Sequence, residues 1–154
     1  MKWYAYAAVI GVFYILYAIF GAALWLSEMF NLPIETGLRN LGAVPDIGLS
    51  IALFTVGALF LGCLRNLEET VKIAVIFIGA ILAVALLALQ ILAAAANALD
   101  FLFLISVNGE AEPQLEVELI RADFILGLLS TPLLYIFYRK MRGIVRESAK
   151  PVSS

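Results

Sequence analysis

Ionisable and amide side chains gather where two long apolar stretches of this chain approach their ends. Two of these residues precede the last apolar stretch, and three lie at the end of the stretch before it. An ionisable group inside a membrane is a functional-site candidate, because lipid offers no hydrogen-bond partner. Carboxylates in such a place are able to gather cations or lipid headgroups, or to hold a partner subunit. The members of this polar cluster are Gln90, Asn97, Asp100, Arg121 and Asp123.

Two interpretations of the polar cluster stay open from the sequence. In the first, Arg121 reaches lipid phosphates while Asp100 and Asp123 mark helix ends at the interface. In the second, the charges lie within the outer leaflet, and Asp100 is the counter-ion of Arg121. A helix over residues 124–138 measures only about 22 Å, against about 30 Å for the hydrocarbon core. This length slightly favours the interface interpretation. The acidic residues are scattered over several helix ends, which is not a metal coordination motif.

The sequence lacks the residues that most catalytic and metal sites need. It has no histidine and one cysteine, Cys63. Zinc, copper and bis-histidine haem sites are therefore not expected, and no internal disulfide forms. We find no Gly-rich phosphate loop, CxxC pair or nucleophile beside a base, and Gln90 does not titrate. We expect no enzyme activity, no cofactor, no metal and no nucleic-acid partner.

Apolar residues dominate the chain that must position this cluster. Of its 154 residues, 64% are hydrophobic and 14% are charged, whereas soluble domains average about 45–50% and 25%. A membrane-spanning helix needs about 20 apolar residues. Three uncharged runs reach this length, and a fourth reaches it only by including its upstream flank. The sequence predicts an all-α integral membrane four-helix bundle as a single domain over 1–154. Its spans are 3–26, 46–64, 71–99 (extending to about 107) and 115–139, followed by a basic tail at 140–154.

The distribution of basic residues predicts the orientation. In an up-down-up-down bundle both termini share one side, and eight of the ten cations then lie on that side. By the positive-inside rule, both termini are expected in the cytoplasm, with the hairpin of helices 3 and 4 projecting beyond the outer surface. The expected location is the plasma (cytoplasmic) membrane. The eight cations are Lys2, Arg65, Lys72, Arg139, Lys140, Arg142, Arg146 and Lys150; the other two are Arg39 and Arg121.

Residue spacing also predicts how the helices pack. Small residues four apart allow close backbone approach, which substitutes for the hydrophobic effect that lipid does not supply. Aromatic residues at steps of three and four mark one side of the first helix, either as a packing surface or as a lipid-facing one. The candidate helix-packing residues are Gly48, Ala52, Ala58, Gly62, Gly79 and Ala83. The aromatic stripe contains Trp3, Tyr6, Phe13, Tyr17 and Phe20, with Ile10 between them.

Residues 101–119 have two interpretations. The alternation Leu-Glu-Val-Glu-Leu at 115–119 is compatible with a β-hairpin against 101–107. We favour extended helices, because no helix breaker interrupts the chain from Thr70 to Val107. Later in the chain, Pro132 is expected to bend the last helix.

Two functions fit these features. The favoured one is a non-catalytic accessory or interaction subunit of a membrane complex, with homo- or hetero-oligomeric membrane partners. The alternative is a carrier or channel-like protein for a small solute or lipid, with an outward-facing cavity bounded by members of the polar cluster. A filled core beside the third helix would favour the first, and an open cavity the second. The basic residues Arg139, Lys140 and Arg142 are expected to bind lipid headgroups.

Overall fold

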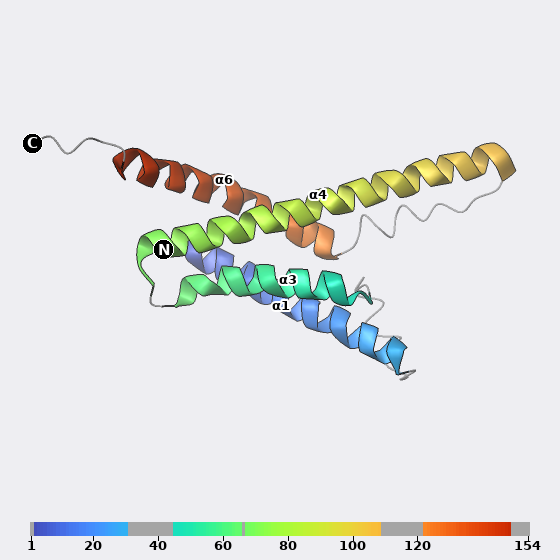
Figure 1. Ribbon diagram of the computed structural model, residues 1–154, viewed down its shortest axis with the longest axis horizontal. Helices are drawn as coiled ribbons and strands as arrows, with labels where there is room; N and C mark the ends of the chain where they lie inside the picture. The colour runs from blue at the N-terminus through green and yellow to red at the C-terminus, as the bar shows by residue number, and fades with distance from the viewer. Residues whose placement is uncertain (1, 31–44, 66, 109–121, 149–154) are drawn as a thin grey trace, which may run out of the picture.

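The computed structural model describes residues 2–30, 45–65, 67–108 and 122–148. Four long helices make up nearly all of these residues (Figure 1). The prediction of an all-α protein is confirmed for this part of the chain. The elements are α1 (Lys2–Met29), α3 (Ile47–Leu61), the short 3₁₀ helix η1 (Gly62–Leu64), α4 (Glu69–Asn108) and α6 (Ala122–Ser148).

Three of the helical stretches are long and apolar enough to cross a membrane. They are Trp3–Met29, Ile47–Leu64 and Glu69–Phe103. Helix α6 is not among them in the described residues, because its uncharged stretch is short and a basic run begins at Arg139. Length and composition therefore support three spans, and the role of α6 as a fourth belongs to the proposal below.

Glycines allow α1 and α3 to approach closely. A Cβ atom on Gly57 would lie 2.7 Å from Ile15 Cγ1 and 2.8 Å from the Gly11 carbonyl oxygen. A Cβ atom on Gly11 would lie 2.9 Å from Phe60 Cβ. Side chains at these two positions would force the helices apart. The missing side chains thus produce the tight backbone packing that stabilises helix pairs in lipid.

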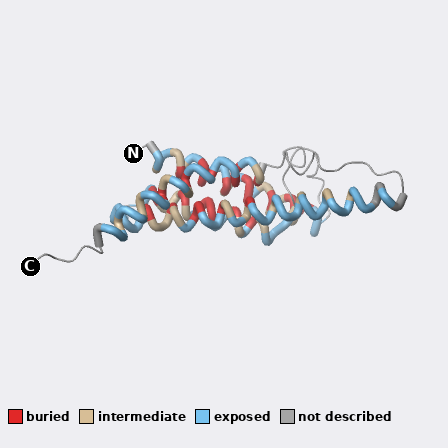
Figure 2. The backbone as a smooth tube through the Cα atoms, turned by 90° about the horizontal axis from the view of Figure 1, so that it is seen from above, coloured by how far each residue is buried: buried red, intermediate tan, exposed pale blue. Residues whose placement is uncertain are grey.

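Apolar side chains from all four helices fill the space between them. Phe60 lies at the centre, with its ring 5.9 Å from the Tyr14 ring and close to the backbone of Gly79. Figure 2 shows the buried residues concentrated where the four helices lie together. The fully buried members include Ala7, Tyr14, Leu53, Val56, Phe60, Ile76, Ala80, Ala83, Leu133 and Phe137.

Helix α4 is much longer than its neighbours. Its 40 residues correspond to about 60 Å, twice the thickness of a hydrocarbon core. Its second half runs past the bundle without another described helix beside it (Figures 1 and 2). We name residues 91–108 the α4 extension. Residues 101–107 therefore continue the helix instead of forming a strand, while 115–119 lie outside the described residues.

Contacts near Tyr4 hold one end of the bundle together. The Tyr4 hydroxyl donates to Glu69 Oε1 at 3.3 Å, and the Cys63 thiol donates to the Tyr4 carbonyl at 3.5 Å. Lys140 Nζ lies 4.9 Å from the centre of the Tyr4 ring. The start of α1, η1, the start of α4 and the later part of α6 thus meet at one end. The start of α1 and the later part of α6 lie toward the same side in Figure 1.

At the opposite end of α3, Asp46 caps the helix. Its side chain accepts a hydrogen bond from the Leu49 backbone N–H at 3.0 Å. A carboxylate there satisfies a first-turn donor and complements the helix dipole.

Candidate functional site

The main polar contact of the candidate site joins α4 to the first turn of α6. Gln90 Nε2 donates to Asp123 Oδ2 at 2.6 Å. Asp123 Oδ1 accepts from the backbone N–H of Phe124 at 3.0 Å. Only 2% of Asp123 is exposed, so this carboxylate is a buried polar group held by specific donors. Hydrogen bonds to a buried carboxylate contribute about 1.5–3 kcal/mol each.

Local helix geometry explains why these two side chains meet. Gly127 lies one turn after Asp123 on the same side of α6, and a Cβ there would lie 2.9 Å from Leu87 Cβ. Leu87 in turn lies three residues before Gln90, on the same side of α4. The absence of a side chain at Gly127 therefore brings the two helices close enough for Gln90 to reach Asp123. The position of Asp123 in the first turn also suits its negative charge.

One atom of the Gln90 amide has no partner. Gln90 Oε1 is buried, yet it accepts no hydrogen bond within the described residues. Leaving a buried acceptor unsatisfied costs about 1–3 kcal/mol. The amide nitrogen therefore donates to the carboxylate of Asp123, while the amide oxygen receives no hydrogen bond within the described residues.

A second polar pair connects α1 to α6. The Tyr14 hydroxyl lies 3.2 Å from Ser130 Oγ, and both residues are buried. Ser130 Oγ also donates to the Leu126 carbonyl at 2.8 Å. Because serine has a single hydroxyl proton, Tyr14 is the donor in the pair. Tyr14 also interacts electrostatically with Asp123, so the two polar contacts belong to one region of the core.

The backbone of α6 receives a further hydrogen bond near Pro132. Proline has no N–H, so Pro132 leaves the Leu128 carbonyl without its usual helical donor. On the neighbouring residue, the Leu129 carbonyl accepts a hydrogen bond from the Tyr6 hydroxyl at 2.9 Å. Helix α1 thus supplies a donor at the point where the hydrogen bonding of α6 is weakest.

The structure brings together two members of the polar cluster, Gln90 and Asp123. Asn97 and Asp100 are exposed on the α4 extension. Arg121 lies outside the described residues, so its pairing with Asp100 stays a prediction. No group of three or more Cys, Asp or Glu side chains in the described ranges is placed to hold a metal ion.

Sequence reasoning missed the buried face of α1. Trp3 and Phe13 of the aromatic stripe are largely exposed, whereas Ile10 and Tyr17 are buried. The missed residue is Tyr14, which none of the expected stripes contains. A different set of positions, also at steps of three and four, would have located it. That set is Ala7, Ile10, Tyr14, Tyr17, Gly21 and Leu24, all of which are buried.

The candidate packing residues lie in different surroundings. Gly79 and Ala83 are buried, and a Cβ on Gly62 would lie 3.0 Å from Val75 Cγ1. Gly48 and Ala58 are exposed, and Ala52 is half-buried. The tightest glycine contacts, at Gly11, Gly57 and Gly127, fall outside the candidate set.

The comparisons with known proteins were negative. No family model, curated protein or solved structure matches this chain. The geometry of the chain itself is therefore the basis for any functional conclusion.

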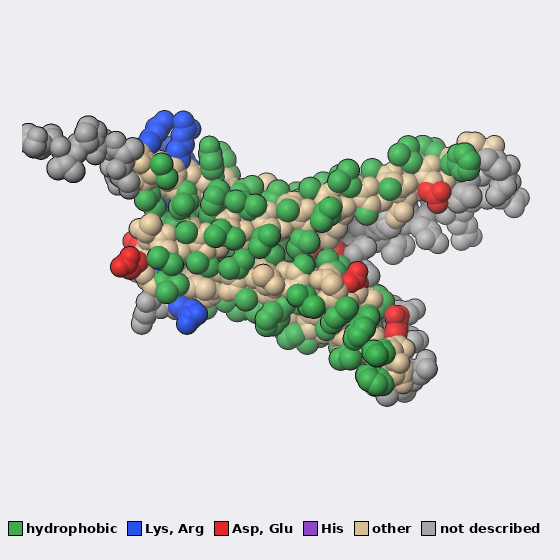
Figure 3. All heavy atoms as spheres, viewed as in Figure 1, with side chains coloured by type: hydrophobic (Ala, Val, Ile, Leu, Met, Phe, Trp, Pro, Cys, Tyr) green, Lys and Arg blue, Asp and Glu red, His purple; other side chains and the backbone are tan. Residues whose placement is uncertain are grey.

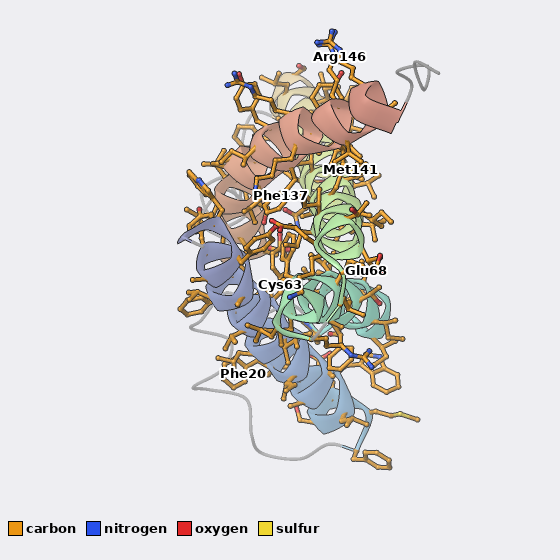
Figure 4. The ribbon with its side chains drawn as sticks, turned by 90° about the vertical axis from the view of Figure 1, so that its left-hand side faces the viewer. Phe20, Cys63, Glu68, Phe137, Met141 and Arg146 are labelled. Atoms are coloured by element: carbon orange, nitrogen blue, oxygen red, sulfur yellow. The ribbon has the colours of Figure 1, made fainter. Side chains whose placement is uncertain are left out.

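The basic residues of α6 lie at the end of the bundle where α1 begins. Figure 3 shows Lys and Arg side chains gathered there, while apolar side chains cover most of the visible face. Figure 4 shows Arg146 pointing away from the bundle and Phe137 pointing between the helices. Lys140 Nζ lies 5.2 Å from the Phe137 ring centre as well as over Tyr4, whereas Arg139 and Arg142 are exposed. This arrangement leaves guanidinium groups accessible at the expected headgroup level.

Proposed function

We propose that this protein is a multi-pass membrane protein that acts as a non-catalytic interaction subunit of a membrane complex. The α4 extension is the observation that carries the proposal. Helices α1, α3, α4 and α6 cross the membrane in alternating directions, with both termini in the cytoplasm. The meeting of Tyr4, Cys63, Glu69 and Lys140 at one end supports this topology, as does the excess of basic residues there.

The length of α4 supports an extension beyond the bilayer, because the candidate span Glu69–Phe103 rises about 52 Å and the hydrocarbon core is about 30 Å thick. The stretch from Lys72 to Gln90 rises about 27 Å, which nearly matches the hydrocarbon thickness of about 30 Å. The α4 extension begins directly after Gln90, and its exposed large apolar residues include Ile91, Leu92, Leu99, Leu102 and Phe103. A contiguous exposed apolar surface outside the lipid is typical of a protein-binding site. A partner that covers this surface would remove it from water.

The packing beside α4 favours an interaction role over a carrier role. Gly79, Ala83 and Leu87 face neighbouring helices and are buried, so the stripe that would line a transport path is filled along this stretch. The carrier alternative, for a small solute or lipid, is favoured by one observation, the unpartnered Gln90 Oε1. It requires a solvated cavity to open beside that oxygen.

The test is the mass of the protein after extraction from its own membrane in a mild detergent. We expect a defined complex for the natural chain. The double variant Leu99→Ala/Phe103→Ala, which truncates side chains 68% and 67% exposed, should release the partner while leaving the thermal stability of the isolated chain unchanged.

A matched control truncates an exposed aromatic residue within a membrane-spanning helix. Phe13→Ala, at a side chain 55% exposed on α1, should keep the complex intact, because lipid covers that face. A lone protein of unchanged mass in every sample would contradict the interaction role. That result would favour the carrier alternative.

A further inference from the structure

The polar contact between α4 and α6 has the composition of a binding site. Asp123 supplies a buried carboxylate, and Gln90 supplies a buried amide oxygen without a hydrogen-bond donor. The two groups are adjacent, since Gln90 Nε2 lies 2.6 Å from Asp123 Oδ2. The nitrogen and oxygen of one amide lie about 2.3 Å apart, so Gln90 Oε1 is no more than about 4.9 Å from that carboxylate oxygen.

The chemistry of these oxygens selects the class of ligand. An acceptor with no donor needs an N–H or O–H group, and a carboxylate beside it favours a donor that carries positive charge. A donor nitrogen with hydrogen bonds of about 2.9 Å to each oxygen spans a gap of this size. A divalent metal ion is a poorer fit, because it takes six or more oxygen ligands and the described residues place no cluster of acidic side chains here.

We propose that Gln90 Oε1 and the Asp123 carboxylate together bind an ammonium group. Gln90 as a whole is half-buried, so the site lies at the edge of the packed core, where the ligand reaches it from outside. The ammonium group is either that of an ethanolamine lipid headgroup or a free ammonium ion. The lipid source rests on the membrane placement proposed above, which puts Gln90 near the outer headgroup level, about 27 Å along α4 from Lys72.

The first experiment compares two cations of equal charge on the purified full-length protein in detergent. Ammonium chloride offers N–H donors, whereas tetramethylammonium chloride at the same concentration offers none. By mass action, a tenfold excess over Kd should raise the midpoint of thermal unfolding by about 3–6 °C. We expect this rise with ammonium and not with tetramethylammonium.

Two variants locate the effect. Gln90→Leu removes the acceptor oxygen and should abolish the ammonium-specific rise. Thr55→Val is the control, since Thr55 is exposed on α3 and bonds only to the Ile51 carbonyl of its own helix; it should keep the rise. If Gln90→Leu does not fold, the comparison of the two salts on the natural chain still tests whether the protein binds an ammonium group.

A second arm distinguishes the source of the ammonium group. The midpoint is measured in lipid particles of phosphatidylethanolamine and of phosphatidylcholine, whose trimethylated nitrogen has no N–H donor. A higher midpoint in phosphatidylethanolamine that disappears in Gln90→Leu assigns the site to the lipid headgroup. An ammonium effect in detergent without a lipid difference assigns it to the free ion. Equal midpoints in both salts and in both lipids would overturn the proposal, and they would leave the interaction role of the α4 extension unaffected.

Discussion

Replacing Gly57 with alanine tests whether glycine contacts set the distance between α1 and α3. The new Cβ atom would lie 2.8 Å from the Gly11 carbonyl oxygen. An ordinary contact begins near 3.4 Å, so the helices must separate by about 0.6 Å, a gap that forfeits a quarter or more of the dispersion attraction across an interface. Overpacking of this kind costs about 1–3 kcal/mol.

A second glycine provides the control. Gly143 lies in α6 with no atom within 4 Å of the Cβ that alanine would add. Alanine also favours helix over glycine by about 0.8–1.0 kcal/mol at both positions. The difference between the two variants therefore isolates the overpacking cost, and we expect Gly57→Ala to be less stable than Gly143→Ala by about 1–3 kcal/mol.

The assay is equilibrium unfolding in mixed micelles as the fraction of denaturing detergent is raised. Gly11→Ala should show a similar loss, because its Cβ would meet Phe60 Cβ and the Gly57 carbonyl. The double variant Gly11→Ala/Gly57→Ala should lose less than the sum, since one helix displacement relieves both contacts. Equal stability of Gly57→Ala and Gly143→Ala would refute the reasoning.

The remaining predictions concern the polar core and the topology. Tyr14→Phe should lower the free energy of unfolding by about 0.5–1.5 kcal/mol, because it removes one buried hydrogen bond; Tyr135→Phe, at a side chain 69% exposed, should be neutral in the same unfolding assay. In a Cys63→Ser background, a membrane-impermeant maleimide should label Ser106→Cys in intact cells and Gly143→Cys only after permeabilisation. Labelling of both from the same side would contradict the proposed alternation of the helices.

Several features of the fold follow from local sequence. Long uncharged runs with few helix breakers produce α1, α3 and α4. The cap at Asp46 is a first-turn effect, and the continuation of α4 through residues 101–107 follows from the lack of glycine or proline there. Each of these depends on neighbours within one or two helical turns, which is why composition and spacing are enough to predict them.

Other features depend on which helix faces which. The sequence places Gln90 and Asp123 in one candidate cluster, but their contact requires the close approach of Gly127 to Leu87. The polar cluster also contains Asn97 and Asp100, which lie further along α4, where no other described helix runs beside it. The spacing of these residues along α4 does not indicate at which level α6 begins to pack beside it.

The sequence by itself determined that the chain is helical and largely apolar, because backbone hydrogen bonding and side-chain hydropathy are local properties. Tertiary structure alone decided which side of each helix is buried. In a soluble protein, hydrophobic periodicity marks that side, but α1 is apolar around its whole circumference, and lipid covers apolar side chains as well as protein does. The rotation of α1 is decided instead by steric fit at Gly11 and Gly57 and by hydrogen bonds from Tyr6 and Tyr14 to α6.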